Sequence, residues 1–346
     1  MPRIFVRGVT SEDYGLKQFR QHQREAMRVR SYDGADHKRL SDETGTSSEG
    51  EGGEIEIRSH IDPADEPFLT QTINVYFQDY PAHSKAGEHG HQNEAAFYII
   101  EGEGYEIHDD ARYDWEQGDV VVVHTDSVHA HYNPGDKPAV VMVMKAKASW
   151  MFLGLVQQSR SHQKFQDPTG TYGPRIEWGQ IWTPGVEEKA KVVKPGDTPW
   201  QLTPLGRFRQ VTDENTRLFS VEIAEIEIPG GSHSGKRWTM ADEALFVRSG
   251  AGYCLQWDVE AEIDEKYYAH VANEPRRYEF KSGETLYVPQ NSVAQYFAND
   301  GEPLFLVSGK NSIFRYLGYD RVAYLESAPE YEAQTVTAVA EPAPAL

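Results

Sequence analysis

The sequence contains one cysteine, Cys254, so the chain cannot form an internal disulfide. It has no apolar run that approaches the roughly 20 residues needed to span a bilayer. The opening residues, MPRIFVRGVTSEDYG, lack the apolar core of a secretory signal. Together these absences predict a cytoplasmic protein that does not enter the membrane.

Positive charge is scarce. The chain has 34 Lys and Arg residues against 54 Asp and Glu residues, and its formal net charge is −20. A field of that sign repels nucleic acid and anionic membrane surfaces, so we expect neither as a partner. A small anionic substrate would need a local positive site.

Two parts of the chain repeat each other. The segment IIEGEGYEIHDD (99–110) matches VRSGAGYCLQWD (247–258), and residues 118–138 match residues 283–303. The second copy carries an insertion around AEIDEKYYAHVANEPRR. Each copy consists of short β-rich runs separated by Gly, Asp and Asn turns. This pattern predicts an all-β chain with two antiparallel jelly-roll barrels rather than βαβ units.

The regions outside the repeats have a different composition. Residues 9–30 predict a helix with Ser11 as its N-cap, and SWMFLGLVQQ (149–158) has helical character. We expect five segments: an N-terminal arm and flexible loop (1–60), a metal-binding barrel (61–148), an interdomain linker (149–198), a degenerate barrel (199–328) and a disordered tail (329–346).

Four histidines stand in two pairs with the same spacing. His89 and His91 lie in GEHGHQNEAAFYIIEGEG, and His129 and His131 lie in SVHAHYN. Residues i and i+2 of a strand share a face, and inward-facing residues of a small barrel converge on its lumen. Two imidazoles from one strand and one from another make a three-point metal site. Imidazole suits Fe, Cu, Zn and Ni alike.

These motifs resemble those of the cupin superfamily. In the first cupin motif His89, His91 and Gly102 are in register, but the glutamate position is Ala95. Glu94 is one residue out of step, so on a regular strand it points away from the lumen. In the second motif Gly118, His129 and Asn133 are in register, whereas His124 and Asp126 replace its proline and glycine.

One cupin branch is especially similar, the gentisate and salicylate 1,2-dioxygenases, in which the glutamate is also an alanine. This resemblance implies one Fe(II) per chain, held by His89, His91 and His129. It implies cleavage of a hydroxylated aromatic ring with O2. It also places His131 beside the substrate as an acid or base and Gln78 as a substrate-binding residue. We further expect a homo-oligomer, a dimer or tetramer.

The chain departs from this branch at Phe97, where the branch has the arginine that binds the substrate carboxylate. Phenylalanine has no donor for a carboxylate. We therefore expect Phe97 to contact the substrate and favour a hydroquinone- or catechol-type ring over gentisate or salicylate. The alternative is a substrate whose anion is bound elsewhere in the pocket.

The second copy lacks the metal motif. Its equivalents of the three ligands are Arg237, Thr239 and Ala294, and Glu243 takes the glutamate position. We expect a structural barrel in which Arg237 and Glu243 form an ion pair. A second small-molecule pocket is the rival interpretation.

Two other functions are compatible with the motifs, because fold alone does not determine activity. One is a different metallo-cupin enzyme, an isomerase or decarboxylase that uses Mn, Zn or Ni. The other is a bicupin that binds a small molecule without catalysis.

Overall fold

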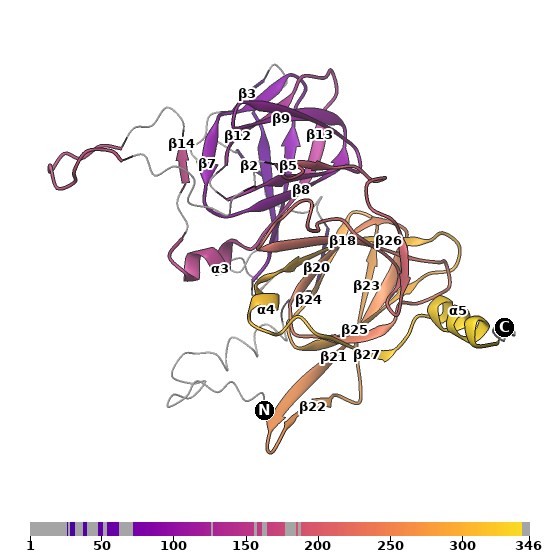
Figure 1. Ribbon diagram of the computed structural model, residues 1–346. Coiled ribbons are helices and arrows are strands. Elements are labelled where there is room, and N and C mark those ends of the chain that lie inside the picture. Colours follow the sequence, from indigo (N-terminus) through magenta and orange to yellow (C-terminus); the bar gives the residue numbers. More distant parts are fainter. Residues whose placement is uncertain are drawn as a thin grey trace, which may run out of the picture.

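The computed structural model describes residues 26, 28–31, 37–39, 48–50, 54–61, 72–125, 127–155, 158–160, 165–176, 185 and 188–340. This part of the chain forms two β-barrels, one above the other in Figure 1, and all of its strand pairs are antiparallel. The expected all-β class is confirmed. Most of the predicted N-terminal helix lies outside the described residues.

The first barrel consists of two sheets that enclose an apolar interior. Tyr80, Phe97, Trp115 and Val143 pack there, and each lies on the inward face of its strand. One sheet contains, in spatial order, β15 (Val192–Val193), β11 (Val120–Val123), β8 (Ala95–Glu101), β13 (Ala139–Lys145), β5 (Asn74–Tyr80), β4 (Glu56–Ile61) and β2 (His37–Arg39). The other contains β10 (Ala111–Glu116), β9 (Glu103–His108), β12 (Val128–Asn133), β6 (Ser84–Ala86) and β3 (Ser48–Gly50), and β7 (His89–His91) pairs with both β12 and β14 (Gln158–Arg160).

The second barrel repeats this plan around an interior that includes Leu245, Tyr296 and Leu306. Its insertion extends one strand into a hairpin that projects from the barrel. One sheet contains β1 (Val29–Ser31), β24 (Glu284–Val288), β20 (Glu243–Ser249), β26 (Leu304–Asn311), β18 (Val221–Ile228), β17 (Gly206–Gln210) and β16 (Gln201–Thr203). The other contains β22 (Tyr267–Val271), β21 (Ala251–Ile263), β25 (Ser292–Ala298), β19 (Lys236–Thr239) and β27 (Val322–Glu326), and β23 (Arg276–Lys281) also pairs with β21.

A third apolar layer lies between the barrels. It contains side chains from β5, β8 and β13 of the first barrel and from β18, β20 and β26 of the second. The rings of Phe77 and Phe246 meet across it with centroids 5.6 Å apart. These strands are therefore covered on both faces, by a barrel interior on one side and by the neighbouring barrel on the other.

The sequence repeat is also visible in the packing of aromatic rings. Tyr105 stacks on Tyr132 with centroids 4.6 Å apart, and the equivalent residues Tyr253 and Phe297 stack at 4.7 Å. In the first barrel the guanidinium of Arg112 lies over the Tyr105 ring. In the second barrel the guanidinium of Arg277 lies over the equivalent Tyr253 ring.

The helices correct three expectations. Residues 329–340 were expected to be disordered, but they form α5 (Pro329–Ala340). The predicted helix at 9–30 does not extend to its expected end, because residues 29 and 30 belong to β1, which pairs with β24. The predicted helix at 149–158 is shorter and earlier, as α3 (Lys147–Phe152). A further short helix is α4 (Ile313–Tyr316). None of the helices in the described part of the chain combines the length and hydropathy that a bilayer crossing requires.

Because the interface layer belongs to both barrels, Phe246→Ala should destabilise the whole chain. Replacement of a buried phenylalanine by alanine typically lowers the free energy of unfolding by about 3–5 kcal/mol. The matched control is Phe165→Ala, since Phe165 is 75% exposed and its loss should change stability by less than about 0.5 kcal/mol. Chemical denaturation measures both. A small effect of Phe246→Ala would show that the barrels are stable independently of this layer.

Candidate metal centre

Strand pairing brings three of the predicted histidines together. His89 and His91 are the first and last residues of β7, so both face the lumen. The antiparallel pairing of β7 with β12 places His129 directly opposite His89. Their ring centroids are 4.4 Å apart, and those of His91 and His129 are 4.8 Å apart.

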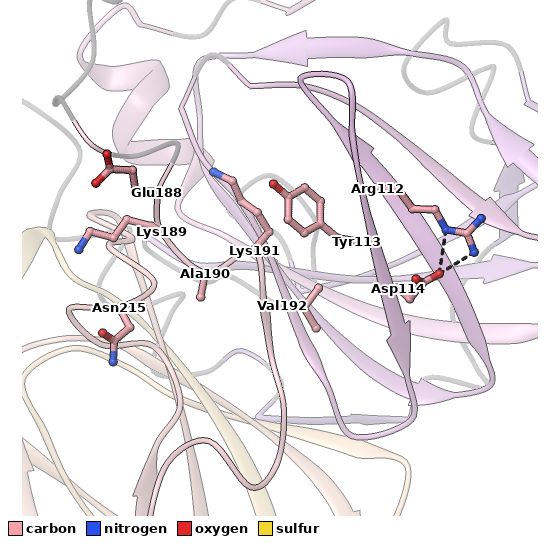
Figure 2. A pocket seen from close by; sticks show the side chains of 9 residues that line it. All are labelled: Arg112, Tyr113, Asp114, Glu188, Lys189, Ala190, Lys191, Val192 and Asn215. Carbon is pink, nitrogen blue, oxygen red and sulfur yellow. Dashed lines mark hydrogen bonds and ion pairs between the residues drawn. The ribbon is translucent and has the colours of Figure 1, made fainter.

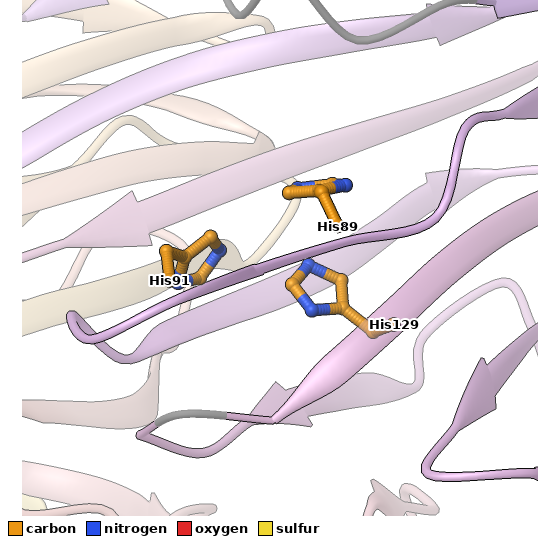
Figure 3. Close-up of side chains that lie close together, drawn as sticks. All are labelled: His89, His91 and His129. Carbon is orange, nitrogen blue, oxygen red and sulfur yellow. The ribbon is translucent and has the colours of Figure 1, made fainter. Parts of the chain in front are cut away.

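All three imidazoles are buried, and one nitrogen of each lies within 4.8 Å of the others (Figure 3). Among the described residues, no other group of His, Cys, Asp or Glu side chains converges in this way. The geometry fits a single metal ion bound by three nitrogen ligands.

Backbone carbonyls determine which nitrogen of each ring is available. Each Nδ1 donates to a carbonyl oxygen two residues away, at 2.5 to 3.0 Å. This hydrogen bond fixes the tautomer and leaves the Nε2 lone pair free for a metal. The Nε2 atom of His129 is buried and has no hydrogen-bond partner. The acceptors are Gly87 for His89, Asn93 for His91 and Ser127 for His129.

Burial also keeps the rings neutral. Desolvation lowers the pKa of His89 to about 4, and it lowers the pKa values of His91 and His129 well below the ordinary histidine value. A metal ligand must present an unprotonated nitrogen. The donor set therefore fits a divalent metal without any further proton loss.

Glu94 has a different role. Its carboxylate is buried and accepts hydrogen bonds from the backbone N–H groups of Phe219 and Ser220 and from the Ser220 hydroxyl, at 2.7 to 2.9 Å. Burial raises the pKa of Glu94, and these hydrogen bonds oppose the rise. Strand parity placed this side chain away from the lumen, and the structure shows what it contacts there, namely the second barrel.

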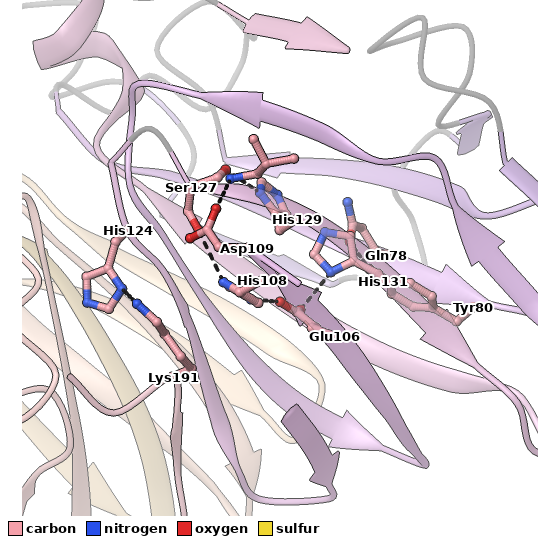
Figure 4. A network of polar contacts seen from close by, with 11 residues as sticks. Gln78, Tyr80, Glu106, His108, Asp109, His124, Ser127, His129, His131 and Lys191 are labelled. Carbon is pink, nitrogen blue, oxygen red and sulfur yellow. Dashed lines mark hydrogen bonds and ion pairs between the residues drawn. The ribbon is translucent and has the colours of Figure 1, made fainter. Parts of the chain in front are cut away.

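His131 lies on the same inward face as His129 and belongs to a buried polar network (Figure 4). Its Nδ1 donates to Glu106 at 2.6 Å, and Nε2 of His108 donates to the other oxygen of that carboxylate at 2.5 Å. Burial alone would raise the pKa of Glu106, but His131 and the two hydrogen bonds outweigh it and lower that pKa to about 2.

Sequence reasoning missed Glu106 and His108. Both lie on the inward face of β9, and the alternation of EGYEIH after the EGEG turn was the available signal. The alternation did not reveal that β9 pairs with β12, which sets Glu106 opposite His131.

The two expected substrate residues lie on the opposite sheet. Gln78 is buried on β5, and the Tyr80 hydroxyl donates to its side-chain oxygen. Phe97 on β8 packs against His131 with ring centroids 4.9 Å apart. Phe97 therefore forms an apolar wall beside the imidazole, and the role of both residues toward a substrate stays a prediction.

The second barrel has an ion pair at the equivalent position. Arg237 lies opposite Ala294, as His89 lies opposite His129. Arg237 Nη2 is 2.5 Å from Glu243 Oε2, and Tyr296, the counterpart of His131, donates to the same oxygen at 3.2 Å. The predicted ion pair is confirmed.

A separate open cleft of about 720 Å³ lies on the surface beside β10 (Figure 2). Three of its charged side chains have partners: Arg112 pairs with Asp114 at 2.6 Å, and Lys191 donates to His124 at 2.8 Å. None of the predicted metal or substrate residues lines it, so we assign it no part in the metal site.

Comparison with known proteins agrees with this geometry. Residues 76–145 match the family described as "Cupin domain". This segment of the chain is a cupin domain. It contains the metal-site histidines of β7 and β12. No curated protein matches the sequence.

Solved structures share the two-barrel cupin fold. A salicylate 1,2-dioxygenase from Pseudaminobacter salicylatoxidans is 14% identical, with a TM-score of 0.58, over 80% of this chain and 81% of that one. A structure of the Pseudoaminobacter salicylatoxidans enzyme as an adduct with gentisate is 12% identical, with a TM-score of 0.57, over 93% and 96%. A single-residue mutant of oxalate decarboxylase from B. subtilis is 12% identical, with a TM-score of 0.57, over 87% and 80%. At these identities the likeness establishes the fold alone.

Removal of one ligand should empty the metal site. His129→Ala should lose nearly all bound iron, whereas the wild type should bind one iron per chain. His270→Ala is the control, because the His270 side chain is 62% exposed in the second barrel. Elemental analysis after anaerobic Fe(II) loading measures the content. Full occupancy in His129→Ala would contradict the three-histidine site.

Glu94→Ala should separate metal binding from stability. It leaves the N–H groups of Phe219 and Ser220 and the Ser220 hydroxyl without this acceptor, which costs about 1–3 kcal/mol, while iron binding should be unchanged. Glu94→Gln retains one acceptor oxygen and should lose less. Loss of iron in Glu94→Ala comparable with that in His91→Ala would identify Glu94 as a ligand after all.

Proposed function

We propose that this cupin is an Fe(II)-dependent dioxygenase that opens the ring of a hydroxylated aromatic substrate. The observation that carries the proposal is a site of three neutral imidazoles with alanine at the position of the usual carboxylate ligand. The shared fold with a salicylate 1,2-dioxygenase supports it. Fe(II) bound by neutral ligands keeps its full positive charge, which lowers the pKa of a coordinated phenol, and it supplies the reactivity with O2.

The side chains around the histidines provide the remaining functions. Because Glu106 accepts the proton of His131 Nδ1, the Nε2 atom of His131 carries a lone pair that can accept a phenol proton. The carboxylate keeps the imidazole in this orientation. Phe97 packs against one side of the buried His131 ring. We propose His131 as the acid or base of the reaction, with Gln78 and Phe97 in contact with the substrate.

A second candidate is a metallo-cupin decarboxylase or isomerase that uses Mn, Zn or Ni. The likeness to oxalate decarboxylase favours including it. The two candidates differ in their use of oxygen, since ring cleavage consumes O2 and decarboxylation of an acid releases CO2. The cytoplasmic location and the homo-oligomeric state stay predictions from the sequence.

Oxygen consumption tests the proposal directly. Fe(II)-loaded protein should consume O2 with at least one member of a panel of hydroquinones, catechols, gentisate and salicylate. In His131→Gln, kcat should fall by about 10²- to 10⁴-fold while iron stays bound. His83→Gln, a change at a partly exposed histidine, should leave kcat unchanged.

Two outcomes would contradict the proposal. One is the absence of O2 uptake across the panel together with CO2 release or isomerisation by the Mn-loaded protein. The other is a normal kcat in iron-loaded His131→Gln. That result would contradict the role of His131 as the acid or base but would not contradict ring cleavage itself.

A further inference from the structure

A lysine stands at the end of a strand whose inward face lines the metal-binding barrel. Val141 and Val143 on β13 point into the barrel interior, and strand alternation directs Lys145 to the same face. Desolvation lowers the pKa of Lys145 to about 8. The ammonium lies 5.4 Å from the centre of the Tyr76 ring. No carboxylate among the described residues forms an ion pair with it.

The charge of this lysine acts on two of the metal-site histidines. After burial, its charge is the largest influence that lowers the pKa of His91, and it also lowers the pKa of His89. In the strand register Met144 pairs with Ala96, and Lys145 and Ala95 are the residues that follow this pair on β13 and precede it on β8. Ala95 is the position at which the cupin motif has its metal-binding glutamate.

The second barrel shows the same arrangement with its anion present. Lys310 is the repeat counterpart of Lys145, and Glu243 is the counterpart of Ala95. Lys310 pairs with Glu243 in the strand register, and its Nζ is 3.8 Å from Glu243 Oε1. The metal-binding barrel therefore keeps the lysine but lacks the carboxylate. Alanine has only a methyl group at this position and cannot pair with the lysine.

We propose that Lys145 binds an acidic group of the substrate, a carboxylate, which takes the place of the glutamate that pairs with Lys310 in the second barrel. This inference rests on the proposed function and deepens it by naming the substrate class. A partly dehydrated ammonium without a counter-ion is costly, and a ligand carboxylate supplies a charge-assisted hydrogen bond. Phe97 then does not exclude an acidic ring, because the cation comes from β13 rather than from β8.

A comparison of an acid with its neutral amide tests the site without catalysis. Calorimetry measures the Kd of salicylate and of salicylamide for Zn(II)-loaded protein, in which no turnover with O2 occurs. The wild type should bind salicylate more tightly. In Lys145→Met the ratio of the two Kd values should fall by about tenfold or more, the effect of one charge-assisted contact. The metal itself can prefer salicylate over salicylamide, but this preference is the same in the wild type and in Lys145→Met. It therefore cancels when the Kd ratios of the two proteins are compared.

Two further variants serve as controls. Lys147→Met removes an exposed lysine two residues away and should leave the ratio unchanged. Lys145→Arg keeps the positive charge and should keep the preference for the acid, so it tests the site even if Lys145→Met folds poorly. Metal content and thermal unfolding are measured for every variant.

The outcomes separate this inference from the proposed function. An unchanged ratio in Lys145→Met, or equal weakening of both ligands, would overturn the carboxylate site. O2 uptake by Fe(II)-loaded protein is measured separately. A ratio that depends on Lys145 without O2 uptake would retain the anion site and reject the dioxygenase. O2 uptake together with a Kd ratio that is unchanged in Lys145→Met would retain the dioxygenase and reject the anion site.

Discussion

The apolar layer between the barrels is the constraint on which the rest of the structure depends. It covers the outer faces of β5, β8 and β13, whose inner faces carry Gln78, Phe97 and Lys145. Strands packed on both faces cannot shift without disturbing two cores. Glu94 adds hydrogen bonds to the same interface, because its carboxylate accepts them from N–H and O–H groups of the second barrel. The second barrel thus supports one wall of the candidate metal site, although the three histidines of that site come from the first barrel.

The two barrels place different charged groups at equivalent positions. In the second, Arg237, Glu243 and Lys310 form a closed cluster in which each charge has a partner. Burial of ions is tolerated only when such partners are present. In the first, histidines replace the arginine and its neighbours, and alanine replaces the glutamate. The duplicated fold therefore allows a direct comparison of the two barrels. In the second, the charged groups pair with one another, whereas in the first the equivalent positions hold the three histidines of the candidate metal site.

The sequence was sufficient for features that depend on strand alternation. The spacing of His89, His91 and His129, and the parity of Glu94, follow from a period of two. Glu106 and Lys145 were missed because their importance depends on which strands are neighbours, which alternation does not reveal. The tail was misjudged on its Ala- and Pro-rich composition, although Pro329 with Glu330 and Glu332 in the first turn is typical of a helix N-terminus.

The charges around the histidines also indicate how a substrate is oriented. Glu106 is negative but satisfied by His108 and His131, so it leaves a proton acceptor, His131 Nε2, on the β12 side of the site. Lys145 supplies a positive charge from the facing sheet. We expect a ring with a phenol and an acidic group to direct the phenol toward His131 and the carboxylate toward Lys145. Orientation of this kind lowers a reaction barrier by fixing the reacting groups before the chemical step. We thus link the loss of the cupin glutamate to substrate recognition: the substitution that leaves the three histidines without a neighbouring carboxylate also leaves Lys145 without a counter-ion among the described residues.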